Sequence, residues 1–288
     1  MARTTSMSGD STALLADPRY ELMPFDTFDD QIEHLPDGAT VTITTSSQFG
    51  IERTIEAAEE AAEQGFEVVP HVSARYVRGD EHLAEIARRL IEIDVDDIFV
   101  PGGDREKPIG DYESAYDLLQ GLERIDCNFE EVGITGYPEG HDFLSDETLA
   151  ESMANKAPYA TYVATQLCFD PNAVLEWITE IRARGVDLSV VVGIPGVMKY
   201  PRLLSISRKV GVGDSVRFLQ KTNGILGFFR QLIGSRGNYT PDALVDGLEP
   251  HADDPEYNIQ SLHIYTFNQV PDTESWRKSR LRDSSPHA

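Results

Sequence analysis

Strand-like and helix-like runs alternate along most of this chain, and that alternation limits the possible folds more than any other feature of the sequence. Eight short runs are rich in Val, Ile, Thr and Tyr, and several are apolar nearly throughout, as strands covered on both faces should be. They are residues 19–23, 40–45, 66–72, 97–102, 131–137, 161–167, 188–194 and 261–267.

Amphipathic stretches separate these runs. Residues 50–65 place Ile51, Ile55 and Ala58 on one helical face and end at a glycine. Residues 170–185 begin with Asp-Pro, a pair that suits an N-cap and the first helical position. Further helices are predicted over residues 79–94 and 145–156, with two or three more over 200–236. The first connection, residues 24–40, has room for only one or two turns of helix.

Eight alternations over about 250 residues are typical of a (β/α)8 TIM barrel. The rival architecture is an open, doubly wound α/β sheet, but no G-x-G-x-x-G follows a strand and no P-loop motif is present. We therefore predict a single barrel over residues 18–269. Residues 1–17 are polar and aperiodic and are predicted to be disordered, and residues 270–288 are predicted to form a loose tail.

The charge balance is strongly acidic. The chain has 49 acidic and 25 basic residues, a net charge of −24, which argues against binding to nucleic acid or to an anionic membrane. Only six of the basic residues are lysines. Two explanations stay open: adaptation to a cytoplasm of high salt, where screening weakens the repulsion, or codon bias in an ordinary acidic protein.

Nothing in the sequence indicates export or membrane insertion. The first residues lack the apolar core of a signal peptide, and no apolar run approaches the length of a membrane span. Two cysteines make no disulfide framework. We therefore expect a cytoplasmic protein.

Polar side chains stand at the carboxyl ends of the predicted strands, where the active sites of such barrels lie. Each alone has a plain structural explanation: His71 as a core histidine, Glu21 as the partner of an arginine. Together they indicate a functional site, because burying a polar group inside a strand costs free energy unless the group has a hydrogen-bond partner. A carboxyl group near apolar walls can serve as a general acid. These side chains are Glu21, Thr44, Thr45, Ser46, His71, Asp104, Tyr137, Glu139, His141, Gln166, Tyr265, Thr266 and Asn268.

No metal-binding spacing stands out. His71, Asp104 and His141 could meet in space, but the chain lacks H-x-H, H-E-x-x-H and C-x-x-C. The sequence therefore predicts no metal site. A nucleophilic serine is equally unsupported, because no G-x-S-x-G is present.

The motifs at the strand ends resemble one known family. In order they are ELMPF, VTITT, PHVSAR, GGD, GYPEGH, ATQLCFD, GIPGV and HIYTFN, over residues 19–269. This set resembles methylenetetrahydrofolate reductase. The resemblance implies a (β/α)8 barrel that reduces 5,10-methylenetetrahydrofolate to 5-methyltetrahydrofolate with NAD(P)H, usually through bound FAD, in one-carbon and methionine metabolism. The expected partner is therefore a small-molecule folate.

The resemblance also implies roles for residues of this chain. Glu21 matches the general acid that protonates N10 of the folate, and Asp104 matches the carboxylate that holds the pterin and favours the cationic iminium. Substrate-binding positions are matched by Asp104, Gln166, Arg202 and Gln269. Flavin-binding positions are matched by Thr44, Thr45, His71, Gly102, Gly103, Ala115, Tyr137, His141 and Lys156.

Several residues depart from the family pattern. The arginine before the strand-four Gly-Asp is Gly102, a basic residue beside Lys156 is Asn155, and a strand-two tyrosine is Thr45. Arg202, Ile206 and Gln269 replace a glutamine, an aromatic residue and an arginine. One hypothesis is weak FAD binding, or direct hydride transfer from NADH. The alternative is that backbone amides replace the lost arginine and FAD is retained.

Two other functions stay open at this point. The chain could be a non-catalytic barrel that binds folate or flavin, including a partner subunit, or another flavin or deazaflavin oxidoreductase on the same fold. The retained Glu21 argues against pure binding, which needs no general acid. The sequence decides neither between NADH and NADPH nor whether the protein forms a homo-oligomer.

Overall fold

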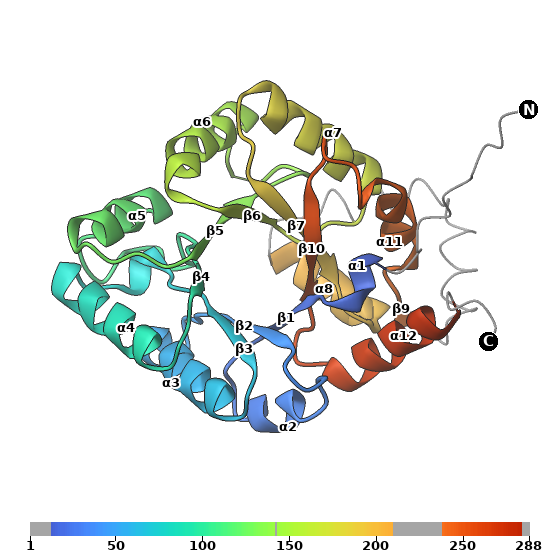
Figure 1. Ribbon diagram of the computed structural model, residues 1–288, viewed down its shortest axis with the longest axis horizontal. Coiled ribbons are helices and arrows are strands. Elements are labelled where there is room, and N and C mark those ends of the chain that lie inside the picture. Colours follow the sequence, from blue (N-terminus) through green and yellow to red (C-terminus); the bar gives the residue numbers. More distant parts are fainter. Residues whose placement is uncertain (1–12, 142, 210–237, 284–288) are drawn as a thin grey trace, which may run out of the picture.

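The protein is a parallel barrel surrounded by helices (Figure 1). A computed structural model describes residues 13–141, 143–209 and 238–283. Its eight-stranded sheet confirms the predicted (β/α)8 TIM barrel, and every predicted strand is present. The barrel strands are β1 Arg19–Leu22, β2 Thr40–Ile43, β3 Glu67–Pro70, β4 Asp97–Phe99, β5 Glu131–Gly136, β6 Tyr162–Thr165, β7 Ser189–Pro195 and β10 Ile259–Tyr265.

The strands follow one another around the ring in the order β3-β2-β1-β10-β7-β6-β5-β4, and all neighbours are parallel. The two ends of this order meet just beyond the named strands. His71 and Phe99 form a parallel bridge there, and the backbone N–H of Val72 donates to the Phe99 carbonyl over 2.8 Å. This seam joins β3 to β4 at their carboxyl ends and nearly closes the ring.

Helices cover the outside of the barrel. The short first connection contains only the five-residue helix α2, as its length predicted. The predicted helices over 200–236 are described only in part, since residues 210–237 lie outside the described ranges. The helices are α1 Ala13–Ala16, α2 Phe28–Ile32, α3 Gly50–Glu63, α4 Asp80–Glu92, α5 Ala115–Arg124, α6 Asp146–Lys156, α7 Pro171–Ala183, α8 Tyr200–Lys209, α11 Asp242–Leu248 and α12 Val270–Asp283, with a small antiparallel pair formed by β8 Met198–Lys199 and β9 Asn238–Tyr239.

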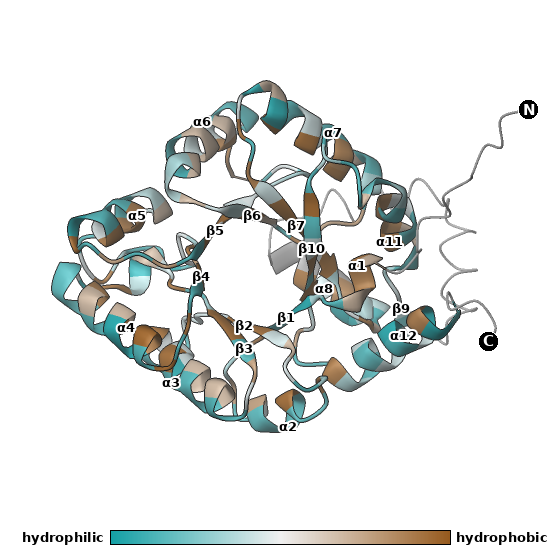
Figure 2. Cartoon of the chain, in the orientation of Figure 1, coloured by the Kyte–Doolittle hydropathy of each residue, from teal (hydrophilic) through white to brown (hydrophobic). Residues whose placement is uncertain are grey.

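The core lies between the strands and the helices. Strand β7 is buried along nearly its whole length, which explains why its sequence is apolar without alternation. Figure 2 shows apolar residues in the strands and a mixture of polar and apolar residues along the surrounding helices. Within the described residues, no helix is both long and apolar enough to cross a bilayer.

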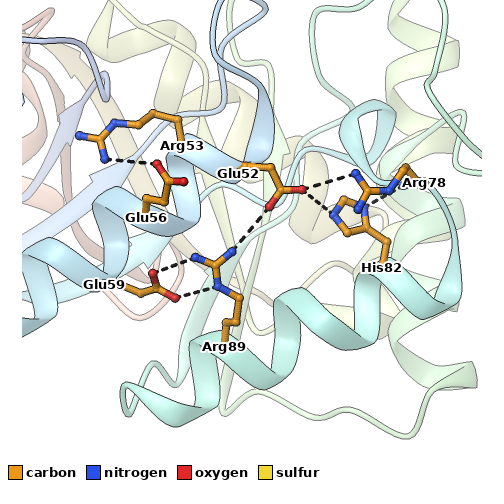
Figure 3. Close-up of polar contacts among 7 residues, drawn as sticks. All are labelled: Glu52, Arg53, Glu56, Glu59, Arg78, His82 and Arg89. Carbon is orange, nitrogen blue, oxygen red and sulfur yellow. Dashed lines mark hydrogen bonds and ion pairs between the residues drawn. The ribbon is translucent and has the colours of Figure 1, made fainter.

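Part of the surface charge is arranged in ion pairs between neighbouring helices (Figure 3). Glu52 of α3 contacts Arg78, His82 and Arg89, and Arg89 also makes a two-pronged contact with Glu59 at 2.7 and 2.8 Å. Exposed pairs of this kind contribute little each, but here they connect α3 to α4.

The end of the chain differs from the predicted loose tail. Residues 270–283 form helix α12, which buries Glu274 and Arg277 against the barrel. Arg277 pairs with Glu274 at 2.6 Å, and the Tyr20 hydroxyl also donates to Glu274. The sequence of this helix is polar, so its hydropathy does not indicate that it packs against the barrel. Its buried charged residues are tolerated because they pair with one another.

The start of the chain also differs in part from the prediction of disorder. Residues 1–12 lie outside the described ranges, but Ala13–Ala16 form helix α1, with Leu14 and Leu15 buried. The Arg277 guanidinium donates to the carbonyls of Leu15 and Ala16. A contact from the far end of the chain therefore fixes this segment, which no local pattern reveals.

A buried ion pair crosses the barrel at the amino ends of the strands. Arg19 of β1 contacts Asp97 of β4 at 2.7 Å, although these strands are not neighbours in the sheet. The Tyr162 hydroxyl donates to the same carboxylate over 2.9 Å, and its ring lies 4.3 Å from the guanidinium carbon. Burial raises the pKa of Asp97 to about 6, and Arg19 and Tyr162 oppose that rise.

We predict that Arg19→Met destabilises the protein by about 3–5 kcal/mol, because it leaves a carboxylate buried without its cation. Arg88→Met is the matched control, since Arg88 forms an exposed helical pair with Glu92 and should cost less than about 0.5 kcal/mol. Urea unfolding measures both. Equal midpoints for the two variants would show that the buried pair has no special weight.

Candidate active site at the carboxyl ends of the strands

Glu21 lies inside the barrel mouth. It is the third residue of β1, and its side chain is 12% exposed. Its Oε2 lies 3.1 Å from Nε2 of His263 on β10. The Thr266 hydroxyl donates to the Glu21 backbone carbonyl over 2.5 Å, which fixes the strand at that residue. The carboxyl group is therefore held in place and has a single side-chain partner among the described residues.

His71 completes a cluster with this pair. It follows β3 directly, and its Nε2 is buried without a hydrogen-bond partner in the described part of the chain. Burial, helped by neighbouring His263, holds the pKa of His71 well below its usual value, so the ring is neutral. Its ring centroid lies 4.8 Å from that of Phe99.

The cluster also has the ligand types of a metal site. One ligand atom from each of Glu21, His71 and His263 lies within 4.8 Å of the others, and two histidines with a glutamate is a known zinc set. In the sequence analysis, the residues that could meet around a metal were His71, Asp104 and His141. The structure groups His71 with a different carboxylate and a different histidine.

Asp104 stands across the β3–β4 seam from this cluster. It is exposed, and its carboxylate accepts a hydrogen bond from the Tyr76 hydroxyl. The two preceding glycines shape this turn. Gly103 has φ of +92°, and a Cβ there would lie 3.2 Å from the Tyr76 ring, whereas a Cβ on Gly102 would meet no atom within 4 Å. Asp104 therefore follows a turn that requires glycine at position 103, because any other residue there would be strained.

The backbone of Thr44 and the side chain of Thr45 make scaffold contacts after β2. The Thr45 hydroxyl donates to the His71 carbonyl over 2.6 Å, and the Thr54 hydroxyl donates to the Thr44 carbonyl over 3.1 Å. Thr45 thus connects the ends of β2 and β3. Its hydroxyl is already engaged by the protein itself.

The other predicted flavin-binding residues follow β5 or lie on its neighbouring helices. The rings of Tyr137 and His141 meet edge to face, with centroids 5.3 Å apart. Lys156 of α6 is buried, and its ammonium group donates to the Thr135 carbonyl over 3.4 Å. Burial lowers the pKa of Lys156 to about 8. Ala115 is the buried first residue of α5.

The remaining predicted residues contact the surrounding scaffold. The Gln166 side-chain oxygen accepts from the Leu167 backbone N–H over 3.2 Å. Arg202 donates to the Phe267 carbonyl over 2.8 Å, and the Gln269 carbonyl accepts from the Thr273 hydroxyl over 3.0 Å. Within the described ranges no hydrogen bond joins Gln166, Arg202 or Gln269 to Glu21 or Asp104.

Comparison with known proteins identifies the family of this barrel. The family model described as methylenetetrahydrofolate reductase matches residues 21–274, most of the chain. The chain belongs to the methylenetetrahydrofolate reductase family.

Individual members of the methylenetetrahydrofolate reductase family are distant in sequence. Methylenetetrahydrofolate reductase 2 of Saccharomyces cerevisiae is 25% identical over 99 residues, 33% of this chain and 16% of that protein. Methylenetetrahydrofolate reductase 1 of Schizosaccharomyces pombe is 25% identical over 90 residues, 31% of this chain and 15% of that protein. These alignments therefore span about a sixth of each relative.

A solved structure supports the fold alone. A chitinase from Rhizomucor miehei superposes with a TM-score of 0.50 at 11% identity, covering 93% of this chain and 100% of the chitinase chain. Identity this low shows only that the two proteins share a barrel.

One residue of the cluster escaped the sequence prediction. The strand-end pattern predicts Tyr265, Thr266 and Asn268 but does not include His263, which lies two residues before Tyr265. Residues two apart in a strand share a face, and the His263 and Tyr265 ring centroids lie 4.7 Å apart. Extending the alternation back from Tyr265 would have found His263.

We predict that Gly103→Ala destabilises the protein by about 1–2 kcal/mol, since alanine is strained at positive φ and its methyl would press on Tyr76. Gly102→Ala is the matched control and should be tolerated, because space there is open. Thermal unfolding of both variants measures the difference. Equal stability would contradict this account of the turn.

Proposed function

We propose that this protein reduces 5,10-methylenetetrahydrofolate to 5-methyltetrahydrofolate with NAD(P)H. The observation that supports this most directly is the Glu21 carboxyl group, held inside the barrel mouth at 3.1 Å from His263, in the region that the family model matches. A binding protein has no use for a carboxyl group placed in this way, whereas a reductase that must open a ring needs an acid.

Glu21 acts as the general acid. It protonates N10 of the folate while the bond from N10 to the methylene carbon breaks, and the bonding electrons stay on N10. The methylene carbon is left as an iminium on N5, ready to accept hydride. The low exposure of Glu21 keeps water from competing for this proton.

Asp104 stabilises the positive charge that ring opening creates. Its carboxylate stands at the same end of the barrel and is oriented by the Tyr76 hydroxyl. Burial and the contact with Asp104 raise the pKa of Tyr76, so this hydroxyl keeps its proton and remains a donor. A carboxylate oriented in this way stabilises a cation that forms beside it.

The site suits one end of a flavin. The buried Nε2 of His71 has no partner among the described residues and needs a polar one. Tyr137 and His141 follow β5, Lys156 of α6 reaches the Thr135 carbonyl of β5, and Ala115 begins α5. These residues would hold FAD, which when bound passes hydride from NAD(P)H to the substrate. Lys156 has only a carbonyl partner among the described residues, so its ammonium group remains available to an anionic group.

Two positions weaken the flavin site. Gly102 offers no cation, and the Thr45 hydroxyl is already bonded to the His71 carbonyl. These features favour a second candidate, in which NADH passes hydride directly to the iminium without flavin. Both candidates use Glu21 and Asp104 in the same roles, so the cofactor requirement distinguishes them.

We predict that Glu21→Gln lowers methylenetetrahydrofolate turnover at least about a hundredfold, because glutamine cannot donate the proton. Folding, measured by circular dichroism, should be unchanged. Glu33→Gln, at an exposed position after α2, is the matched control and should keep full activity. Normal turnover by Glu21→Gln would remove this residue from the proposed role.

We predict that Gly102→Arg strengthens FAD binding about tenfold, since it returns a guanidinium to a position with free space. Quenching of flavin fluorescence gives the dissociation constant, and Gly102→Ala is the control for the loss of glycine. If the arginine and alanine variants bind FAD equally, Gly102 does not lie beside the flavin.

A further inference from the structure

We propose that Glu21, His71 and His263 form a binding site for a divalent transition-metal ion such as Zn²⁺, and that the ion, when bound, blocks the acid of the active site. The metal site itself stands on the geometry of the cluster. Only the block rests on the proposed function, because it requires Glu21 to be the acid.

The cluster is assembled from strands that lie close together in the barrel. Along the sheet order β3-β2-β1-β10, His71 directly follows β3, Glu21 lies on β1 and His263 lies on β10. One ligand atom from each lies within 4.8 Å of the others. The three residues come from separate strands, so no short motif joins them, and for that reason the sequence predicts no metal site.

The separations suit a metal ion. Nitrogen and oxygen ligands at about 2.1 Å from a tetrahedral Zn²⁺ stand about 3.4 Å apart. The 3.1 Å between His263 Nε2 and Glu21 Oε2 is close to that value. The ligand atom of His71 lies within 4.8 Å of the other two, so its ring must approach by no more than about 1.4 Å to complete the set. Three protein ligands leave a fourth position open.

Two buried polar atoms at this level of the barrel have no partner in the described part of the chain, namely His71 Nε2 and the Thr42 hydroxyl. Thr42 of β2 is in register with Glu21, and cross-strand neighbours project from the same face of a sheet, so both point into the barrel. Both His71 and Thr42 are more than nine-tenths buried. An unpartnered polar atom is costly to bury, so this part of the interior is suited to a polar guest.

The surroundings favour a cation of the transition-metal class. Among the described residues, no lysine or arginine forms an ion pair with Glu21. The Tyr265 ring packs beside His263, but its hydroxyl donates to the Thr165 carbonyl, so it is not available as a competing partner. The net charge of −24 draws cations to the protein. Two imidazole nitrogens select a first-row transition metal over Mg²⁺ or Ca²⁺, which prefer oxygen ligands.

Metal binding and proton transfer exclude each other at Glu21. A carboxylate oxygen that gives its lone pair to the ion carries no proton, so the protein with bound metal cannot protonate N10. His71 is also withdrawn from the flavin when it binds the ion. The ion therefore acts as an inhibitor that a chelator reverses.

Binding is measured by titrating the full chain, first stripped of metal with a chelator, with Co²⁺. Co²⁺ occupies sites of this ligand type, and its visible absorption intensifies when it leaves six-coordinate water for a site with fewer ligands. One equivalent should bind with intense visible bands, and Zn²⁺ should abolish them. His71→Gln and His263→Gln should each lower the affinity at least about a hundredfold, since a direct ligand matters more than an outer partner. Glu21→Gln repeats the test if either histidine variant fails to fold.

His82 supplies the matched control. It is also buried and lies 3.0 Å from Glu52, between α3 and α4, but this pair has no third metal ligand in the described ranges (Figure 3). His82→Gln should bind Co²⁺ as the wild type does. Equal losses in His82→Gln and His263→Gln, or unchanged affinity in every variant, would overturn the proposal. A titration without visible bands would also overturn it and leave the two unpartnered atoms to water.

Turnover separates the metal site from the proposed function. Zn²⁺ at a concentration that fills the site should lower methylenetetrahydrofolate turnover at least about a hundredfold, because the general acid is lost, and a chelator should restore it. Full turnover with the site filled would overturn the proposal. A metal-free protein that binds Co²⁺ as expected but never reduces the folate would reject the reductase function and keep the metal site.

Discussion

The closure of the barrel between β3 and β4 determines where the chemistry of this protein is placed. Backbone hydrogen bonds continue past the two strands, from Val72 to Phe99, Ala74 to Pro101 and Arg75 to Gly102, at 2.8–3.0 Å. His71 lies on one side of this seam and the turn that presents Asp104 on the other. A parallel ring closes only when the two ends of its strand order, here β3 and β4, are joined, so the same contacts also bring two halves of the site together.

Much of the fold follows from the sequence, because strands that are buried on both faces are apolar throughout and helices show a periodic apolar face. The ends of the chain do not follow from it. Helix α12 is polar along its length, yet Glu274 and Arg277 are buried as a mutually satisfied pair. Leu14 and Leu15 are held by a guanidinium more than 250 residues away in sequence. Packing that depends on partners remote in the chain leaves no local pattern to read.

The site shows the same division. Glu21 and His71 can be predicted because polar groups at strand ends stand out in a sequence, and the structure places them in one cluster. His263 cannot be predicted in the same way, because it lies within a strand, where a histidine is ordinarily a core residue. Thr45 is a flavin-binding residue by prediction, but its hydroxyl donates to the His71 carbonyl and so supports the scaffold. The sequence shows where such residues lie in the chain. Only the structure distinguishes a side chain that supports the scaffold from one that is free to contact a ligand.

The pairing of β1 with β10 has a consequence for the order in which the protein is made. Tyr20 is in register with Ile264, and the Thr266 hydroxyl holds the Glu21 carbonyl. A ribosome releases β1 more than 200 residues before β10, so β1 has no partner on that side until β10 has emerged. The contacts that orient Glu21 therefore form only after β10 is synthesised, and a chain truncated before β10 lacks them. Long-range closure of this kind delays assembly of the site until most of the barrel is present.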